Sequence, residues 1–303
     1  MYVFNRRRVA ALLLAAVCLT GQTGAVRAEE TQVKTVSETE NNMRPKEAQE
    51  ENGEKERARK LTEDNSENEQ SAALQEKSAA ELVKLLPAGS LLPMERISDE
   101  ESRACFTAAV IEPQGAVYER IYEKSYKENG NTQLSELRYL KLPHYNYEGR
   151  LQVGEMIVHE EIADTVLQIF YELYQEQYQI CSMYLVDDFW TGDNESTDTA
   201  SLEANNTACF NDRSIVGSGS VSRHALGKAI DLNPLENPYV KERDGVRTIL
   251  PEEGEAYLDR ESGAEHLITH QDAAYRIFSA YGFEWGGDWS SLKDYQHFEF
   301  NQS

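Results

Sequence analysis

The residues of this chain that are best suited to chemistry lie in two short segments near its C-terminal end. The first opens at Ser222 and places His224 and Asp231 on either side of small residues, and the second contributes Asp294 and His297. Imidazole nitrogens and carboxylate oxygens are good Zn²⁺ ligands, and a catalytic zinc site needs about three protein ligands and one open position. We therefore expect a single zinc ion to be held by His224, Asp231 and His297.

A carboxylate close to this predicted site supplies the second requirement of metal-assisted hydrolysis. Asp294 lies three residues before His297, where it can accept a proton from an activated water as a general base. Glu299 shares a strand face with His297 and can support it from behind. Each histidine alone is better explained as a hydrogen-bonded structural residue, and Asp231 alone as a turn or cap residue. The prediction therefore depends on the combination.

The first segment reproduces the Ser-x-His-x-x-Gly-x-Ala-x-Asp motif of the VanY-type D-alanyl-D-alanine carboxypeptidases, in the LAS group of zinc peptidases. The matching residues are Ser222, His224, Gly227, Ala229 and Asp231. Asp294 and His297 resemble the second motif of this family. The resemblance spans residues 137–299 and is strongest from Asn206 onward. It implies an α+β fold of the Hedgehog/DD-peptidase type, three zinc ligands at His224, Asp231 and His297, and a general base at Asp294.

The resemblance also implies an arginine upstream of the first motif that stabilises the oxyanion. Arg213 is the best match and Arg223 is the alternative, since a guanidinium can donate two hydrogen bonds to the developing oxygens. A surface arginine in a polar loop is the other interpretation of Arg213. We expect Ser222 and Trp289, like Glu299, to contact substrate or to support the ligands. Trp285 and Tyr295 could line the cleft, although aromatic residues are core residues at least as often.

The second motif departs from the commoner form of the family. Many members have Glu-Trp-Trp-His, whereas this chain has Asp-Tyr-Gln-His, which resembles the branch that includes L-alanyl-D-glutamate endopeptidases. We favour a D-alanyl-D-alanine carboxypeptidase acting on peptidoglycan stem peptides and keep the endopeptidase as the alternative. A non-catalytic wall-binding module with a structural zinc site is a third hypothesis, and a surface adhesin is a fourth. The candidate carboxylate anchors for the substrate are Lys228, Arg223 and Lys293, although a solvated surface cation is the commoner interpretation of each.

The N-terminal segment predicts export. Residues 1–28 contain Arg6–Arg8, the apolar run Val9–Leu19 and small residues up to Ala28, which are the parts of a secretory signal peptide. We expect cleavage after Ala28 and a secreted, cell-wall-associated product with no stable membrane insertion. An uncleaved anchor is the alternative, but the run is shorter than the ~20 residues that a membrane span needs.

The composition after the signal predicts one linker and one domain. Residues 29–80 contain no Phe, Trp, Tyr or Ile, so they cannot bury enough apolar surface to offset their ordering entropy. We place a largely disordered, acidic, low-complexity linker at 29–97 and the zinc peptidase domain at 98–303, with its motif core at 206–299. We expect a monomer.

Charge and cysteine content exclude other classes of protein. The net charge of -23 excludes nucleic-acid binding by phosphate neutralisation, because such proteins need a basic face. Cys105, Cys181 and Cys209 remain after signal removal, without a CxxC spacing, so core thiols with at most one disulfide are expected. His266 and His270 have a helical metal spacing, but their neighbours indicate a loop and a helix start.

Hydrophobic spacing predicts a mixture of helices and short strands without a βαβ rhythm, which favours an α+β domain. The polar stretch 190–221 is a candidate cleft wall. The predicted elements are helices at 117–127, 160–177 and 271–281, a hairpin at 137–158 that turns at 147–149, and strands at 181–186 and 295–300.

Overall fold

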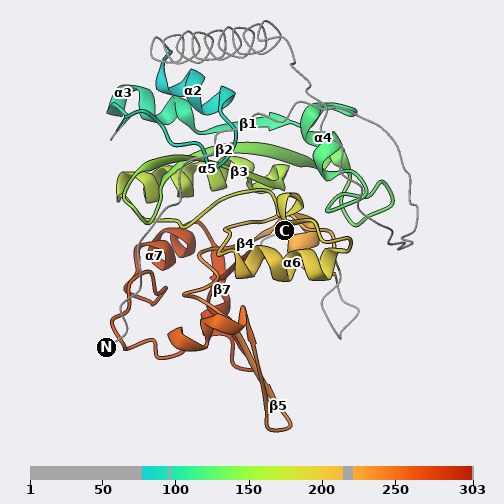
Figure 1. Ribbon diagram of the computed structural model, residues 1–303, viewed down its shortest axis with the longest axis vertical. Coiled ribbons are helices and arrows are strands. Elements are labelled where there is room, and N and C mark those ends of the chain that lie inside the picture. Colours follow the sequence, from blue (N-terminus) through green and yellow to red (C-terminus); the bar gives the residue numbers. More distant parts are fainter. Residues whose placement is uncertain (1–76, 95–96, 214–220, 302–303) are drawn as a thin grey trace, which may run out of the picture. The chain divides into compact units, whose positions relative to one another are not determined.

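The computed structural model describes residues 77–94, 97–213 and 221–301 (Figure 1). All of them lie in one unit of the chain, Leu61–Ser303. The predicted signal peptide at 1–28 and the predicted linker from residue 29 to residue 76 lie outside the described residues.

A three-stranded antiparallel sheet forms one half of the structure. It consists of β1 (Thr107–Val110), β2 (Leu137–Tyr145) and β3 (Leu151–His159), in the order β1-β2-β3. β2 and β3 form the predicted hairpin, with Leu137 opposite His159 and Tyr145 opposite Leu151. The Asn146 side chain closes the turn by accepting hydrogen bonds from two backbone N–H groups, those of Glu148 and Arg150, both at 3.0 Å.

Helix α5 (Glu160–Gln175) packs on this sheet and confirms the predicted helix at 160–177. The His159 side chain caps its N-terminus, and two glutamates occupy the first turn. Their negative charges interact favourably with the positive end of the helix dipole. Its buried side chains recur at helical spacing. Helix α7 (Ala273–Ala280) packs against α5, with the Phe170 and Phe278 rings 6.3 Å apart, edge to face.

Two further small sheets carry the chemically capable residues. β4 (Ala229–Asp231), β9 (His297–Phe300) and β7 (Phe283–Trp285) form one in the order β4-β9-β7, and β6 (Val246–Leu250), β5 (Tyr239–Arg243) and β8 (Lys293–Asp294) form the other in the order β6-β5-β8. All pairings are antiparallel. The structure therefore confirms the α+β class.

Short helices complete the description. The α-helices are α2 (Ala79–Leu85), α3 (Asp99–Ser102), α4 (Ala116–Ile121) and α6 (Asn194–Glu203). The 3₁₀ helices are η1 (Arg103–Cys105), η2 (Leu134–Glu136), η3 (Val186–Phe189), η4 (His224–Leu226), η5 (Glu252–Tyr257) and η6 (Gly286–Asp288). Helix α4 is shorter than the predicted helix at 117–127.

The folded region extends further toward the N-terminus than the boundary expected at residue 97. Helix α2 begins at a capping box formed by Ser78 and Glu81, and its Leu82 and Val83 side chains are fully buried in the main core. Leu92 is buried in the same core. The segment from residue 77 onward therefore contributes apolar side chains to the domain, although the residues before it are polar.

Two other predictions differ from the structure. The segment 181–186 forms one isolated bridge, between Ser182 and Asn206, rather than a strand, and the predicted polar loop at 190–221 contains helix α6. Cys105, Cys181 and Cys209 are all free thiols, and the first and last are buried. Within the described ranges we find no helix with the length and apolar character of a membrane span.

Candidate metal centre

A glycine-dependent turn delivers His224 and Asp231 to the same place. His224 opens η4, which ends at Gly227 with a φ of 63°, a left-handed conformation that favours glycine. A Cβ at Gly227 would lie 2.7 Å from the His159 backbone nitrogen, because the Gly227 carbonyl accepts a hydrogen bond from that N–H at 2.8 Å. The chain then enters β4, whose last residue is Asp231.

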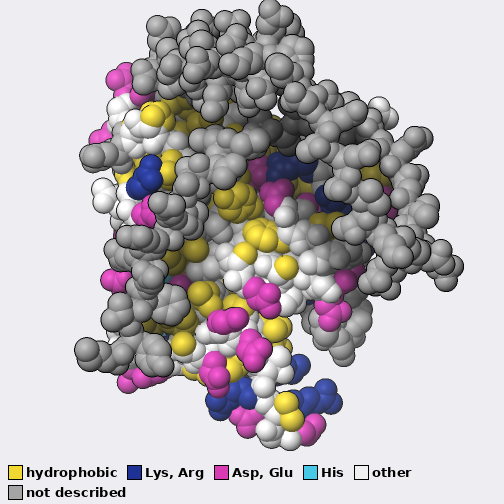
Figure 2. Space-filling model, in the orientation of Figure 1, with side chains coloured by type: hydrophobic (Ala, Val, Ile, Leu, Met, Phe, Trp, Pro, Cys, Tyr) yellow, Lys and Arg dark blue, Asp and Glu magenta, His cyan; other side chains and the backbone are white. Residues whose placement is uncertain are grey.

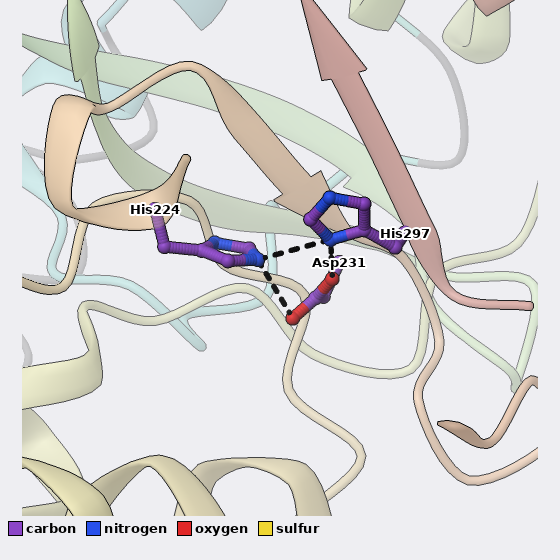
Figure 3. A group of neighbouring side chains, drawn as sticks. All are labelled: His224, Asp231 and His297. Atoms are coloured by element: carbon purple, nitrogen blue, oxygen red, sulfur yellow. Dashed lines mark hydrogen bonds and ion pairs between the residues drawn. The ribbon is translucent and has the colours of Figure 1, made fainter. Parts of the chain in front are cut away.

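The third residue of the group comes from β9, which pairs with β4. Asp231 lies directly opposite His297 in the antiparallel register. Figure 3 shows the three side chains converging, with His224 Nε2 3.2 Å from His297 Nδ1 and 3.2 Å from Asp231 Oδ2. His297 Nδ1 lies 3.1 Å from Asp231 Oδ1. The three residues expose 6–7% of their surface, so the cluster is shielded but reachable from solvent.

Each histidine uses its other ring nitrogen to contact an acceptor behind it. His224 Nδ1 donates to the Cys209 carbonyl at 2.7 Å, and His297 Nε2 donates to Glu299 Oε2 at 3.2 Å. These hydrogen bonds leave His224 Nε2 and His297 Nδ1 directed at Asp231. Because a carbonyl or carboxylate behind a histidine orients the ring and raises its basicity as a ligand, this donor set fits a zinc ion.

The charges of the cluster favour a bound cation. Burial disfavours the Asp231 carboxylate, but His224 and His297 overcome this and hold its pKa well below its usual range. Burial likewise opposes a charge on His297, whereas hydrogen bonds to Asp231 and Glu299 raise its pKa to about 10. The cluster therefore attracts positive charge, which a proton or a metal ion can supply.

Asp294 lies beside the cluster as a half-buried residue whose Oδ1 atom is buried. Its Oδ1 atom has no hydrogen-bond partner. Burial and the negative charge of Asp231 together raise the pKa of Asp294 to about 7, although the positive charges of His297 and His224 oppose them. Gly286 packs tightly against it, because a Cβ at Gly286 would lie 2.6 Å from the Asp294 carbonyl oxygen.

Residues 216–300 match the family model described as D-alanyl-D-alanine carboxypeptidase. Over these residues the chain is similar to that peptidase family. The match confirms the resemblance found in the sequence motifs. Comparisons with curated proteins and with solved structures gave no match.

The matched region contains His224, Asp231, His297 and Asp294, but Arg213 precedes it. The Arg213 guanidinium forms an ion pair with Asp198 of α6, with an N–O distance of 2.6 Å. Its Nε atom is buried and has no partner. The oxyanion role of Arg213 therefore stays a prediction.

The other supporting residues predicted within the peptidase region lie close to the histidines. The Ser222 hydroxyl accepts a hydrogen bond from the His224 N–H at 3.2 Å and so helps to form the turn. The Trp289 ring lies 5.2 Å from the His297 ring, centroid to centroid. Glu299 is half-buried against His297, as the strand alternation predicts.

The three predicted carboxylate anchors differ in what they contact. Lys228 forms an ion pair with Glu161, and the Lys293 ammonium donates to the Gly287 carbonyl at 2.9 Å. Burial opposes the charge on Glu299, but hydrogen bonds to His297 and Asn301 and the charges of His297 and Arg223 lower its pKa, which places Arg223 within electrostatic range of Glu299. Two of the three cations are therefore already engaged.

His266 and His270 do not form a second metal pair. The His266 ring stacks on Tyr147, with centroids 3.8 Å apart, and its φ of 66° places it in a loop. His270 contacts Asp288 at 2.8 Å. Among the described residues, the group with metal-binding geometry is His224, Asp231 and His297.

Sequence reasoning missed two backbone contributions to the site. The Cys209 carbonyl orients His224, and Gly286 allows the close approach of Asp294. A carbonyl acceptor has no signature in a sequence, because every residue carries one. The glycine pair at 286–287 was a visible signal, but its function depends on a contact that only the folded chain creates.

Proposed function

We propose that this chain is an exported zinc peptidase that hydrolyses D-amino-acid-containing stem peptides of peptidoglycan, as a D-alanyl-D-alanine carboxypeptidase. The observation that supports it best is the buried His224–Asp231–His297 cluster, with an unpartnered Asp294 carboxylate oxygen beside it. The family match supports the peptidase class. We further propose that the enzyme acts as a monomer at the cell wall.

In this proposal His224, Asp231 and His297 hold one zinc ion, and a zinc ion in such a site acidifies water and polarises a carbonyl. Asp294 accepts a proton from the attacking water and returns it to the leaving amine. Burial raises the pKa of Asp294 to about 7, which suits a group that must both take and give a proton near neutral pH. Its free Oδ1 atom is the acceptor that this step needs.

Arg213 is proposed to stabilise the oxyanion. A guanidinium preorganised by an ion pair loses little entropy when it donates to a developing negative charge. The contact with Asp198 supplies that preorganisation. In this proposal Arg213 donates to the oxyanion through nitrogen atoms that do not contact Asp198.

A direct test is mass spectrometry of defined pentapeptide muropeptides incubated with the purified protein and zinc. Loss of one terminal alanine is the expected result and establishes a carboxypeptidase. Release of the stem peptide after its first L-Ala establishes the endopeptidase that the Asp-Tyr-Gln-His motif suggests. No zinc-dependent product would contradict the proposal and favour a binding module with a structural zinc site.

Two variants separate metal binding from proton transfer. His297→Ala removes a ligand, so we expect loss of zinc and of turnover together. Asp294→Asn removes the base without removing a ligand, so zinc content should stay near one per chain while turnover falls by about 10²–10⁴-fold. Zinc content measured by elemental analysis distinguishes a metal ligand from a general base. Equal metal loss in both variants contradicts the role assigned to Asp294.

A further inference from the structure

Asp294 lies in a different sheet from the two strand-borne ligands. Asp231 and His297 are held opposite each other by the β4–β9 pairing, whereas Asp294 lies in β8 and pairs with Tyr239 of β5. Only Tyr295 and Gln296 separate Asp294 from His297 along the chain. The position of the carboxylate relative to the ligands therefore depends on how this two-residue junction is fixed.

Tyr295 is anchored at three points. Its N–H donates to the Pro238 carbonyl at 3.3 Å, and its own carbonyl accepts a hydrogen bond from the Trp285 indole at 2.8 Å. The third anchor is a stacking contact, in which the Arg260 guanidinium carbon lies 4.4 Å from the centre of the Tyr295 ring. A planar guanidinium is well suited to such stacking because its face is weakly hydrated.

The edge of the Arg260 guanidinium is bound by neutral oxygens from three other segments. One terminal nitrogen donates to the Glu236 and Tyr257 carbonyls at 2.7 and 3.1 Å, and the other donates to the Asn237 side chain at 2.6 Å and the Ile268 carbonyl at 3.0 Å. All four of these acceptors are carbonyl or amide oxygens, and none is a carboxylate. These four hydrogen bonds use both terminal nitrogens of the planar guanidinium, whereas Nε has no partner, and the single ammonium of a lysine cannot reproduce them.

Asn237 connects this arrangement to the segment that follows Asp231. Asn237 is fully buried, and its amide nitrogen donates to the Asn233 and His266 carbonyls, both at 3.0 Å. Its side-chain oxygen accepts from Arg260 and from the Ile268 N–H at 2.7 Å. Arg260 thus connects the segment that follows Asp231 to the Tyr295 ring.

We propose that Arg260 is a positioning residue that sets the place of the Asp294 carboxylate relative to the metal ligands, through its stack on Tyr295. This inference rests on the proposed function in treating Asp294 as the base. The β4–β9 pairing holds Asp231 and His297 without help from Arg260, so the loss of Arg260 displaces the base and leaves the metal site intact.

The test compares Arg260→Lys with the wild-type protein and with Arg247→Lys, the same change at an exposed arginine of the β5–β6 hairpin. We expect Arg260→Lys to lower kcat about 10–100-fold, because a displacement of about 1 Å can cost that much. KM and zinc affinity should stay within about threefold of wild type, since neither depends on the base. Circular dichroism at the assay temperature confirms that equal folded amounts are compared.

Substitutions of Tyr295 test the route of the effect. Tyr295→Phe keeps the stacked ring and should keep kcat near the wild-type value, whereas Tyr295→Leu should resemble Arg260→Lys. The double variant Arg260→Lys/Tyr295→Leu should be no slower than the slower single variant, because the two changes remove one contact. An unchanged kcat in Arg260→Lys, or a parallel loss of zinc affinity, overturns the proposal.

A crystal structure of zinc-bound Arg260→Lys gives a readout that does not need activity. We expect the Asp294 carboxylate to move relative to His224, Asp231 and His297 while these three stay in place. If the wild-type protein cleaves no muropeptide, the proposed function has failed, yet the displacement of Asp294 still decides the positioning role. An unmoved Asp294 overturns the positioning role even if the enzyme is active.

Discussion

At the scale of single residues, the geometry of the His224–Asp231–His297 cluster depends on the acceptors behind the two histidines as well as on the three side chains themselves. His224 is oriented by a backbone carbonyl and His297 by the Glu299 carboxylate. The four residues that we propose for the chemistry could be named from the sequence because the types and spacing that such chemistry needs are restricted. The carbonyl behind His224 could not be named, since it depends on where the chain folds back.

Removal of Glu299 should weaken zinc binding without removing a ligand. Glu299→Ala deletes the acceptor for His297 Nε2–H, so the ring loses its fixed orientation and zinc affinity should fall about 10–100-fold. Competition with a chelating dye measures this. Glu284→Ala is the matched control, because Glu284 faces Glu299 across the β7–β9 pair but is exposed and does not contact a ligand. Equal affinities for the two variants would contradict the role of Glu299.

His144 should make the protein less stable in mild acid. Burial lowers the pKa of His144 to about 4, partly offset by a hydrogen bond to the Leu142 carbonyl, whereas an unfolded chain has a histidine pKa of about 6.5. Below that value the unfolded chain binds a proton that the folded chain does not bind. The free energy of unfolding should therefore fall as pH falls from about 6.5 toward 4, by up to about 3 kcal/mol.

The measurement is urea unfolding at pH 7.5 and pH 5 for the wild type and for His144→Leu. Other titrating groups contribute equally to both proteins, so their difference isolates His144. The wild type should lose more stability than the variant over this interval. Identical pH dependence in the two proteins would show that His144 does not carry the effect.

At the scale of elements, sequence periodicity predicted best the helices and strands that bury one regular face. Helices α5 and α7 have such faces, whereas the strands of the β2–β3 hairpin are buried along most of their length on both faces. Residues 181–186 are also apolar, but side-chain amides take the place of strand partners. The Cys181 N–H donates to Asn233 Oδ1 at 3.0 Å and the Tyr184 N–H to Asn206 Oδ1 at 2.8 Å. Such pairing arises from tertiary contacts and leaves no periodic signal.

Helix α6 is a regular element that the sequence pattern did not predict. Its N-terminus has a good cap, since Asp193 accepts hydrogen bonds from the Glu195 and Ser196 N–H groups. However, its buried side chains are Thr197, Ser201 and Leu202, so no apolar stripe marks the helix in the sequence. Polar burial of this kind is decided by the neighbours that satisfy the hydroxyl groups.

Helix α2 should contribute measurably to the stability of the domain, although it lies in the predicted linker. Leu82 is 1% exposed and Leu85 is 61% exposed in the same short helix. Leu82→Ala should lower the free energy of unfolding by about 2–5 kcal/mol because it leaves a cavity, whereas Leu85→Ala should change it by less than about 0.5 kcal/mol. Chemical denaturation of both variants measures the difference. Similar values for both would mean that the helix does not pack on the domain in solution.

At the scale of the whole molecule, negative charge governs how the protein meets other polymers. The chain carries a net charge of -23. Figure 2 shows acidic side chains next to the β5–β6 hairpin and Lys and Arg side chains on the hairpin itself. A hollow of about 730 Å³ next to this hairpin is lined partly by Glu203, Glu242, Glu252 and Glu255. A surface of this kind repels anionic wall polymers over the Debye length of about 8 Å at physiological ionic strength.

We therefore expect a mobile enzyme that does not adhere to purified walls through charge. Cosedimentation at pH 7 should leave the protein in the supernatant at low salt and at about 0.15 M salt, because lower salt lengthens the range of the repulsion. Near the sequence pI of about 4.7 the net charge vanishes, and retention should rise there. Strong retention at pH 7 and physiological salt would contradict this prediction, since only specific contacts could then outweigh the repulsion.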